Sequence, residues 1–452
     1  SSVSDVSPEG WPVFLLSDIP PQGADELAIE RPEIYFGETD SNWVIIRTDQ
    51  GEFSGIVENP DDATAGFQGE AYGAIGIGNP ITRALAALSL GDRNVFLSSQ
   101  LTGDSELLMH RSVIARADRI APVLDYDHDP YMVIADGRLV WVIDAYTSSD
   151  AFPSAKRYDG SNYLRNGVKV TVDAYTGETT FYRTTMPDPI ADAYDRIYPG
   201  LFKDISEVPP AIAAHFRYPE MQFTMQSRVW AEYHVDSART IAQESLGGEV
   251  VPMEPFFVTQ RLPNEEETVF ALTVPFTPGG QQNRQNMTAW MAGTAGTGGD
   301  TDLRLYRYPR QQTVFGPRQI EAQIAQDPEI SEQITLWNQM GSEVIQGNLL
   351  VIPVNDAMLY VQPVYLQATA SNATAPRLVG VIVATNREVV MAPTLAEAID
   401  LLGTPGESVV APDQPAEPDT GQPPADAGLP ADAPADLAGM SRDQLVQEAV
   451  RT

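Results

Sequence analysis

The chain has 452 residues, a net charge of −34 and no cysteine. This charge would repel a phosphate backbone and so excludes a nucleic-acid partner, and the lack of cysteine excludes disulfides, thiolate nucleophiles and cysteine-ligated zinc. The apolar fraction of 43% is enough for a large core, and the length allows two or three domains.

The first half of the chain alternates strand-like and helical patterns. β-Branched and aromatic residues predict strands at 32–38 and 43–47, and apolar residues at helical spacing predict helices at 81–90 and 105–120. Two hairpins and a further helix follow: strands 131–135 and 139–144 around Asp136-Gly137, strands 168–173 and 179–183 around Thr176-Gly177, and a helix over 188–198.

The four residues Asp-Ala-Tyr-Thr occur twice, at 144–147 and at 173–176. Each copy follows an apolar run of strand character. We interpret both as a strand that ends in a turn stabilised by the Asp and Thr side chains.

The second half shows the same mixture of patterns. Helices are predicted at 218–235, 328–340 and 393–402, and strands at 256–276, 349–353, 358–361, 364–367, 378–384 and 388–391. Pro363 is expected to separate two of these strands. Because regular β–α alternation is missing, we predict an α+β fold of mainly antiparallel hairpins with interspersed helices, in an N-terminal lobe (1–205) and a C-terminal lobe (206–402).

The composition changes sharply after residue 402. Residues 403–437 consist mostly of Pro, Ala, Asp, Glu and Gly, which predicts a disordered acidic linker. A helical pattern starts again within 438–452, with Ser441 as its N-cap. We expect this helix to continue into further protein.

Three carboxylates at alternate positions, Asp125, Asp127 and Asp129, form the only candidate metal site in the sequence. In an extended segment they would share one face and could bind calcium, which takes six to eight oxygen ligands. The run does not match an EF-hand loop, because Pro130 stands where glycine is needed. The alternative is a polar turn in which the Asp side chains bond to backbone amides.

No catalytic residues can be assigned from sequence motifs. No Gly-x-Ser-x-Gly sequence occurs, and the glycine-rich run at 293–299 is not followed by the Lys-Ser/Thr of a phosphate-binding loop. A pair of carboxylates for hydrolysis stays an open alternative, since such residues meet only in the tertiary structure.

An ordered succession of short phrases carries a resemblance to a known family. The phrases include Ile-Tyr-Phe-Gly-Glu at 34–38, Leu-Ser-Ser-Gln-Leu at 97–101, Phe-Arg-Tyr-Pro-Glu at 216–220, Trp-Ala-Glu-Tyr-His-Val at 230–235 and Tyr-Val-Gln-Pro-Val-Tyr at 360–365. Over residues 10–402 the chain resembles the uncharacterised protein family 0182. These are large bacterial proteins with several N-terminal transmembrane helices and a large extracytoplasmic domain.

The resemblance implies a place for the chain but no activity, because the family has no established substrate or catalytic residues. It implies membrane helices upstream of Ser1 and a domain on the extracytoplasmic side of the plasma membrane. We therefore expect a domain that binds a partner protein or a component of the cell envelope. The alternatives are an envelope hydrolase and an accessory domain of a transporter. A deep cleft with facing carboxylates would favour the hydrolase, and an exposed apolar patch would favour binding.

Overall fold

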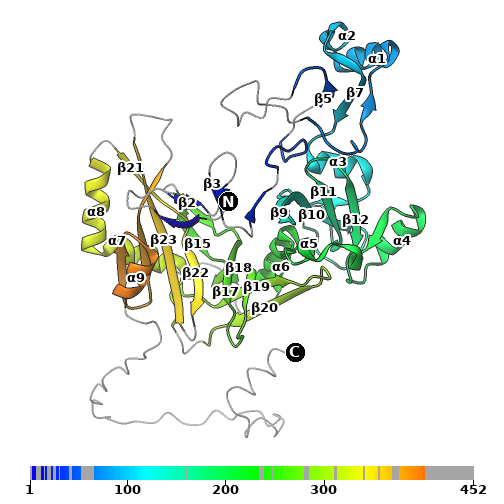
Figure 1. Ribbon diagram of the computed structural model, residues 1–452. Coiled ribbons are helices and arrows are strands. Elements are labelled where there is room, and N and C mark those ends of the chain that lie inside the picture. Colours follow the sequence, from blue (N-terminus) through cyan, green and yellow to red (C-terminus); the bar gives the residue numbers. More distant parts are fainter. Residues whose placement is uncertain are drawn as a thin grey trace, which may run out of the picture. The chain divides into compact units, whose positions relative to one another are not determined.

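The computed structural model describes most of the chain up to residue 402 (Figure 1). The described residues are 3–6, 12–14, 16–17, 22–23, 27–29, 31–39, 43–51, 66–158, 160–233, 239–246, 249–278, 285–309, 313–339, 342–354, 357–368 and 376–402. The predicted linker at 403–437 and the predicted helix in 438–452 lie outside the described residues. In the described part, no helix is both long enough and apolar enough to span a bilayer.

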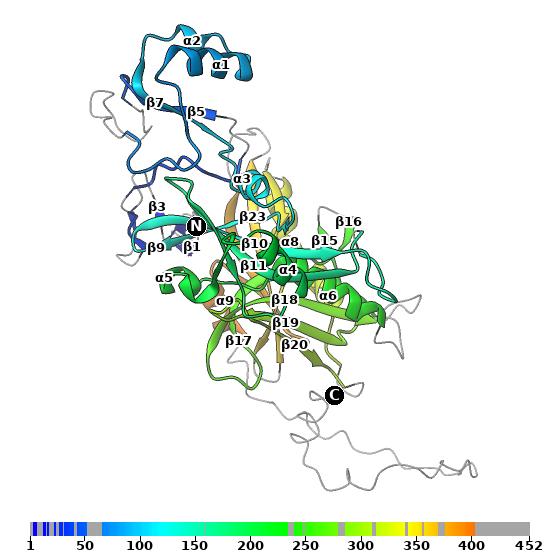
Figure 2. The same ribbon diagram turned by 90° about the vertical axis from the view of Figure 1, so that its right-hand side faces the viewer.

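A three-stranded antiparallel sheet joins residues that are far apart in the sequence. Its strands, in spatial order, are β5 (Trp43–Thr48), β7 (Leu101–Met109) and β6 (Ile75–Gly76). Two helices, α1 (Pro80–Leu90) and α2 (Asn94–Leu97), connect β6 to β7. In Figures 1 and 2 both helices lie together at the end of this sheet that is farther from α3 (Val113–Ile120).

Strand β7 shows that the predicted helix over 105–120 was wrong in its first half. The helix begins only at Val113, where the Ser112 side chain caps it. Leu107 and Leu108 are both buried, in different clusters, because the two faces of β7 are covered. An apolar run of this kind fits a helix or a buried strand, and here distant strand partners decide the outcome. The strand predicted at 32–38 is reduced to one isolated bridge between Gly37 and Ser112.

A six-stranded sheet follows in the sequence. Its strands, in spatial order, are β13 (Phe202–Asp204), β12 (Thr179–Arg183), β11 (Tyr163–Asp173), β10 (Arg138–Ser149) and β8 (Asp125–Tyr126), with β9 (Tyr131–Ala135) also paired to β10. All pairs are antiparallel except β12 with β13. The hairpin predicted at Asp136-Gly137 is confirmed: φ is 51° at Asp136 and 76° at Gly137, as a tight two-residue turn requires.

Both faces of the six-stranded sheet are buried. On β10, Trp141 and Ile143 belong to the cluster on one face, and Val142 belongs to the cluster on the other. This explains why the strand reads as a continuous apolar run rather than as an alternation. The short helical elements of this half are α3, α4 (Pro189–Ile197), η3 (Ile205–Glu207) and α5 (Pro210–Ala213).

The second half contains two five-stranded sheets. In the first, β14 (Arg239–Ile241), β18 (Thr268–Pro278), β19 (Ala289–Ala295) and β20 (Thr301–Arg307) lie in that order, with β17 (Phe256–Arg261) on β18. In the second, β21 (Ser342–Gln346), β23 (Ala357–Ala368), β24 (Arg377–Ala384) and β25 (Val389–Ala392) lie in that order, with β22 (Leu350–Val354) on β23. The helices are α6 (Glu220–Tyr233), α7 (Pro317–Gln326), α8 (Pro328–Gln339) and α9 (Leu395–Leu401).

Short antiparallel ribbons complete the described strands. They are β1 (Val3–Val6) with β2 (Pro12–Phe14), β3 (Leu16–Ser17) with β4 (Gln22–Gly23), and β15 (Gln243–Leu246) with β16 (Glu249–Pro252). One expectation about the second half was wrong: β23 runs through Pro363 without a break. The missing N–H is tolerated beside a bulge between Val364 and Tyr365, and the Pro363 carbonyl still accepts a hydrogen bond from Gly347 N at 2.8 Å.

The fold is α+β, as predicted, with mainly antiparallel sheets and interspersed helices. The helices predicted at 328–340 and 393–402 are confirmed as α8 and α9. The lobe boundary near residue 205 stays a prediction.

Candidate functional site

The three predicted calcium ligands have different surroundings. Asp125 is exposed in β8, where it pairs with Tyr146 of β10. Asp127 is buried and accepts hydrogen bonds from the Tyr146 hydroxyl at 2.6 Å and from Met221 N at 3.1 Å. Asp129 forms an ion pair with Arg217 at 2.6 Å.

These partners occupy carboxylate oxygens that a metal would need. Within the described ranges, no cluster of three or more His, Asp or Glu residues is arranged to hold a metal ion. The backbone amide that Asp127 binds belongs to Met221 at the start of α6, so this bond is a long-range contact and not one within the alternative polar turn. Calcium binding at Asp125, Asp127 and Asp129 stays a prediction.

A buried ion pair lies close to this turn, between neighbouring strands. Lys169 of β11 faces Asp144 of β10 in the sheet register, and its Nζ donates to the Asp144 carboxylate. Both side chains are buried, and Asn166 Nδ2 donates a second hydrogen bond to the same carboxylate oxygen at 3.1 Å. Burial raises the pKa of Asp144, although Lys169 opposes the rise. A charge in such a place must be paired to be tolerated.

The pair explains why the two Asp-Ala-Tyr-Thr copies differ. The second copy behaves as expected, since Asp173 Oδ1 accepts hydrogen bonds from Tyr175 N and Thr176 N in a turn. The first copy lies in the middle of β10, so the predicted turn at 144–147 was wrong. Here Thr147 donates to the Asp188 carboxylate at 2.6 Å, and Asp144 pairs with Lys169. The network stabilises the strand register and faces neither of the two pockets described below.

Two further carboxyl groups, of Glu220 and Glu244, have raised pKa values. Burial is the main cause for both, and Asp127 and Asp129 add to it at Glu220. Glu244 accepts a hydrogen bond from Leu349 N at 3.3 Å, which gives it a structural role. Neither residue lines either of the two pockets described below.

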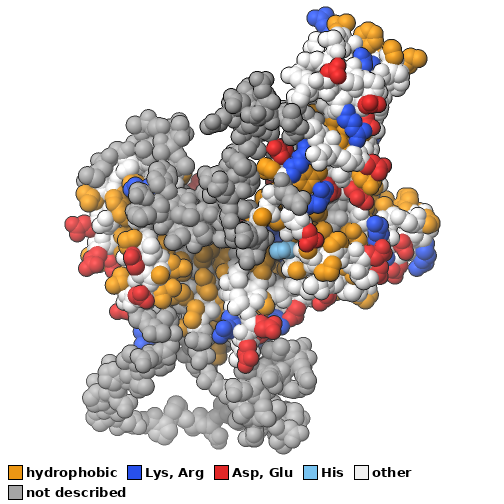
Figure 3. Space-filling view, viewed as in Figure 1, with side chains coloured by type: hydrophobic (Ala, Val, Ile, Leu, Met, Phe, Trp, Pro, Cys, Tyr) orange, Lys and Arg blue, Asp and Glu red, His pale blue; other side chains and the backbone are white. Residues whose placement is uncertain are grey.

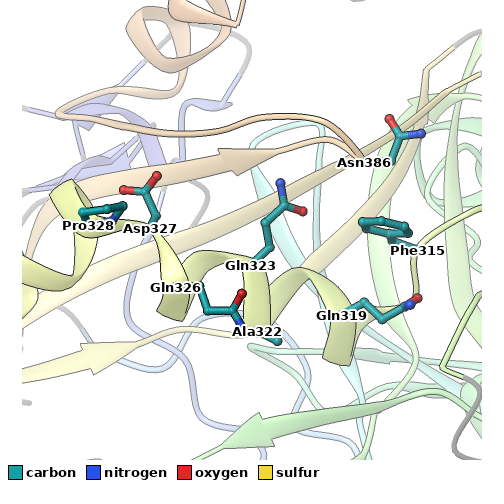
Figure 4. Close-up of a pocket in the computed structure, with 8 residues that line it drawn as sticks. All are labelled: Phe315, Gln319, Ala322, Gln323, Gln326, Asp327, Pro328 and Asn386. Atoms are coloured by element: carbon teal, nitrogen blue, oxygen red, sulfur yellow. The ribbon is translucent and has the colours of Figure 1, made fainter. Parts of the chain in front are cut away.

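One pocket, of about 560 Å³, lies along α7 and the start of α8 (Figure 4). Its polar lining is mostly uncharged: Gln319, Gln323, Gln326 and Asn386, with Asp327 as the acidic member. Asp327 accepts a hydrogen bond from Ile330 N at 3.0 Å and so stabilises the start of α8. In Figure 4 Gln323 points away from α7 on the side where Phe315 and Asn386 lie. This lining supplies neither a nucleophile with a base nor two facing carboxylates.

One surface of the described chain is apolar. Five large side chains of α1 and α2 form it, and we call it the α1–α2 apolar surface. Their exposed fractions are 73% for Ile81, 60% for Leu85, 80% for Leu88, 46% for Phe96 and 69% for Leu97. Figure 3 shows apolar side chains gathered at this end of the β5–β7 sheet.

Helix α1 presents three large residues outward and packs two small ones inward. Ala86 and Ala87 are buried in a small cluster with Val95 and Leu107, while Leu85 and Leu88 face away from it. A surface helix of a soluble domain normally shows the reverse arrangement. The Asn79 side chain caps α1 by accepting hydrogen bonds from the backbone N–H groups of Ile81 and Thr82. The outward stripe is therefore fixed on a well-capped helix.

The segment around this surface also has few acidic residues. Residues 71–103 contain one acidic residue, Asp92, and two arginines, Arg83 and Arg93. The whole chain has 62 acidic and 28 basic residues. If this surface contacted only water, its content of acidic residues would not be expected to differ so strongly from that of the rest of the chain.

The family model for the Uncharacterised protein family (UPF0182) matches residues 1–337. The chain belongs to the UPF0182 family. It is 40% identical over 419 residues to a UPF0182 protein of Pelotomaculum thermopropionicum, covering 90% of this chain and 45% of that protein. It is 42% identical over 416 residues to UPF0182 protein bll7333 of Bradyrhizobium diazoefficiens, covering 89% and 44%. No solved structure matches the chain.

This UPF0182 chain spans less than half the length of the curated relatives it matches. Their names state no activity. The surface on α1 and α2 was not expected from the sequence, which indicated only a helix at 81–90. The signal that could have revealed it is the pair of adjacent alanines on one helix face with Ile81, Leu85 and Leu88 on the other.

Proposed function

We propose that this chain is a non-catalytic extracytoplasmic domain of a membrane protein, and that it contacts the lipid bilayer through the α1–α2 apolar surface. The observation that carries the proposal is the exposure of five large apolar side chains on two adjacent helices. Exposed apolar patches of this kind mark sites of interaction with proteins or membranes.

Charge favours a bilayer as the occupant. A chain with a net charge of −34 is repelled by an anionic surface, and a part with few acidic residues can approach lipid more closely. The segment 71–103 is such a part, with Asp92 as its one acidic residue. Amphipathic helices at interfaces bind with leucine and phenylalanine side chains in the boundary between headgroups and acyl chains.

The free energy gained by burying these side chains is of the size expected for reversible membrane binding. Full burial of a Leu, Ile or Phe side chain is worth about 1.5–3 kcal/mol. Scaled by the exposed fractions, the five side chains provide about 5–10 kcal/mol before the cost of immobilisation. This range includes the binding of a single myristoyl chain, about 10⁴ M⁻¹, which suits a domain held at the membrane by a further anchor.

Flotation with vesicles of zwitterionic phosphatidylcholine tests the proposal. The wild-type chain should float with the vesicles, and Leu85→Ser should bind about tenfold more weakly. Leu401→Ser is the matched control, because Leu401 is a helical leucine of similar exposure, 63% against 60% for Leu85. Equal binding by the two variants, or no flotation of the wild type, would refute a bilayer contact. If the wild-type chain does not bind vesicles but retains a protein from solubilised native membranes through the α1–α2 apolar surface, the occupant of this surface is a protein partner and not lipid.

A further inference from the structure

A second pocket lies beside an arginine whose charge has no partner in the described chain. Arg116 of α3 is only 8% exposed. Its Nε donates to the Gly177 carbonyl at 2.7 Å, and its Nη2 donates to the Tyr72 carbonyl at 2.6 Å. The guanidinium carbon lies 4.7 Å from the centre of the Phe36 ring. These partners are neutral, and no described carboxylate forms an ion pair with Arg116.

An unpaired buried charge is costly, so such groups are normally paired with an opposite charge. Burial lowers the pKa of Arg116, which reflects the same penalty on its charged form. Since arginine stays protonated at physiological pH, the site holds a fixed positive charge. An anion from solution would supply the missing partner.

The pocket, of about 350 Å³, has room for a small molecule. Its lining includes Arg116, Arg119 and His110 and no Asp or Glu. Met109 and Ile120 add apolar surface to the same pocket. The lining therefore combines cationic and apolar groups, although the chain has 62 acidic residues. Such a lining fits an anion with an apolar part.

Glycine at position 73 leaves space beside the guanidinium. Gly73 lines the pocket with φ at 73°, and a Cβ at this position would lie 3.4 Å from Nη2 and 3.8 Å from Nη1 of Arg116. His110 has φ at 53°, a conformation that residues other than glycine rarely adopt. The pKa of Tyr72 is raised, first by the negative charge of Glu178 and then by burial and by Glu70. The side of the pocket near the Tyr72 hydroxyl is therefore unfavourable for an anion.

We infer that this pocket binds a small amphipathic anion, with its carboxylate or phosphate against Arg116 and Arg119 and its apolar chain against Met109 and Ile120. Arginine binds both head groups through paired N–H donors. The inference does not depend on the α1–α2 apolar surface, and the two can fail separately.

Calorimetric titration of the whole chain tests this inference with defined probes. Hexyl phosphate or hexanoate should bind at one site, and the stronger of the two identifies the head group. Inorganic phosphate should bind more weakly because it lacks the apolar part. Hexylammonium, with the opposite charge, should not bind.

Exposed residues provide variants that leave the fold intact. Arg119→Gln should weaken the binding of the preferred anion about fivefold. Arg93→Gln, which removes an exposed arginine outside the pocket, should leave it unchanged. The inference is overturned if neither anion binds, if hexylammonium binds equally well, or if the two variants bind alike. Equal affinity for inorganic phosphate and hexyl phosphate would overturn the proposed contact of the apolar chain with Met109 and Ile120.

Discussion

Removal of the Lys169 ammonium tests the buried ion pair most sharply. In Lys169→Met the long side chain can still pack near Phe216, whose ring lies 5.4 Å from Nζ, but Asp144 loses its cationic partner. Breaking a buried pair on one side costs about 3–5 kcal/mol. We expect the lower end, about 3 kcal/mol at pH 7, because Asn166 still donates to Asp144 at 3.1 Å and because Asp144 can take up a proton.

Urea denaturation followed by tryptophan fluorescence measures this loss. The loss should shrink as the pH falls, since protonation then relieves the unpaired carboxylate of Asp144. Asp144→Asn added to Lys169→Met should recover most of the stability. Lys203→Met, at an exposed lysine of β13, should change the free energy of unfolding by less than about 0.5 kcal/mol. A loss below about 1 kcal/mol in Lys169→Met, or no recovery in the double variant, would refute the reasoning.

Three further outcomes follow from the described contacts. Burial, together with Asp127 and Asp129, raises the pKa of Glu220, so its ionisation destabilises the folded state above its unfolded-state pKa near 4.5. Glu220→Gln should therefore raise the melting temperature at pH 7 and leave it unchanged well below pH 4.5; an equal rise at both pH values would contradict this cause. Asn79→Ala should cost about 1 kcal/mol in thermal unfolding, because it removes the cap of α1, and a neutral effect would mean that the cap contributes nothing. The partners of Asp127 and Asp129 predict no change in melting temperature with millimolar calcium or a chelator, whereas a rise with calcium that a chelator removes would support the sequence-based site.

Local patterns predicted the elements whose conformation is decided locally. The hairpin at Asp136-Gly137 needs positive φ at two adjacent residues, and the sequence contains residues suited to that turn. The turn after β11 needs an Asp that can accept two backbone N–H groups, and Asp173 does so. Helices α8 and α9 have their own caps and breakers, so their approximate positions could be predicted.

Features that depend on distant partners could not be predicted. Leu107 and Leu108 read as part of a helix because nothing near them indicates that β5 and β6 will pair with β7. Asp144 and Asp173 stand in identical four-residue contexts, and only the register opposite Lys169 separates their roles. The sequence also gave no reason to expect that Arg116 would be buried without a carboxylate.

The absence of cysteine allows the central claim to be tested at a single position. Leu88→Cys, labelled with a polarity-sensitive fluorophore, places the probe on the most exposed side chain of the α1–α2 apolar surface. Leu401→Cys places the same probe on an exposed leucine of α9. A bilayer contact predicts a blue shift of emission on addition of phosphatidylcholine vesicles at position 88 and none at position 401. An unchanged spectrum at position 88, or equal shifts at both positions, would contradict it.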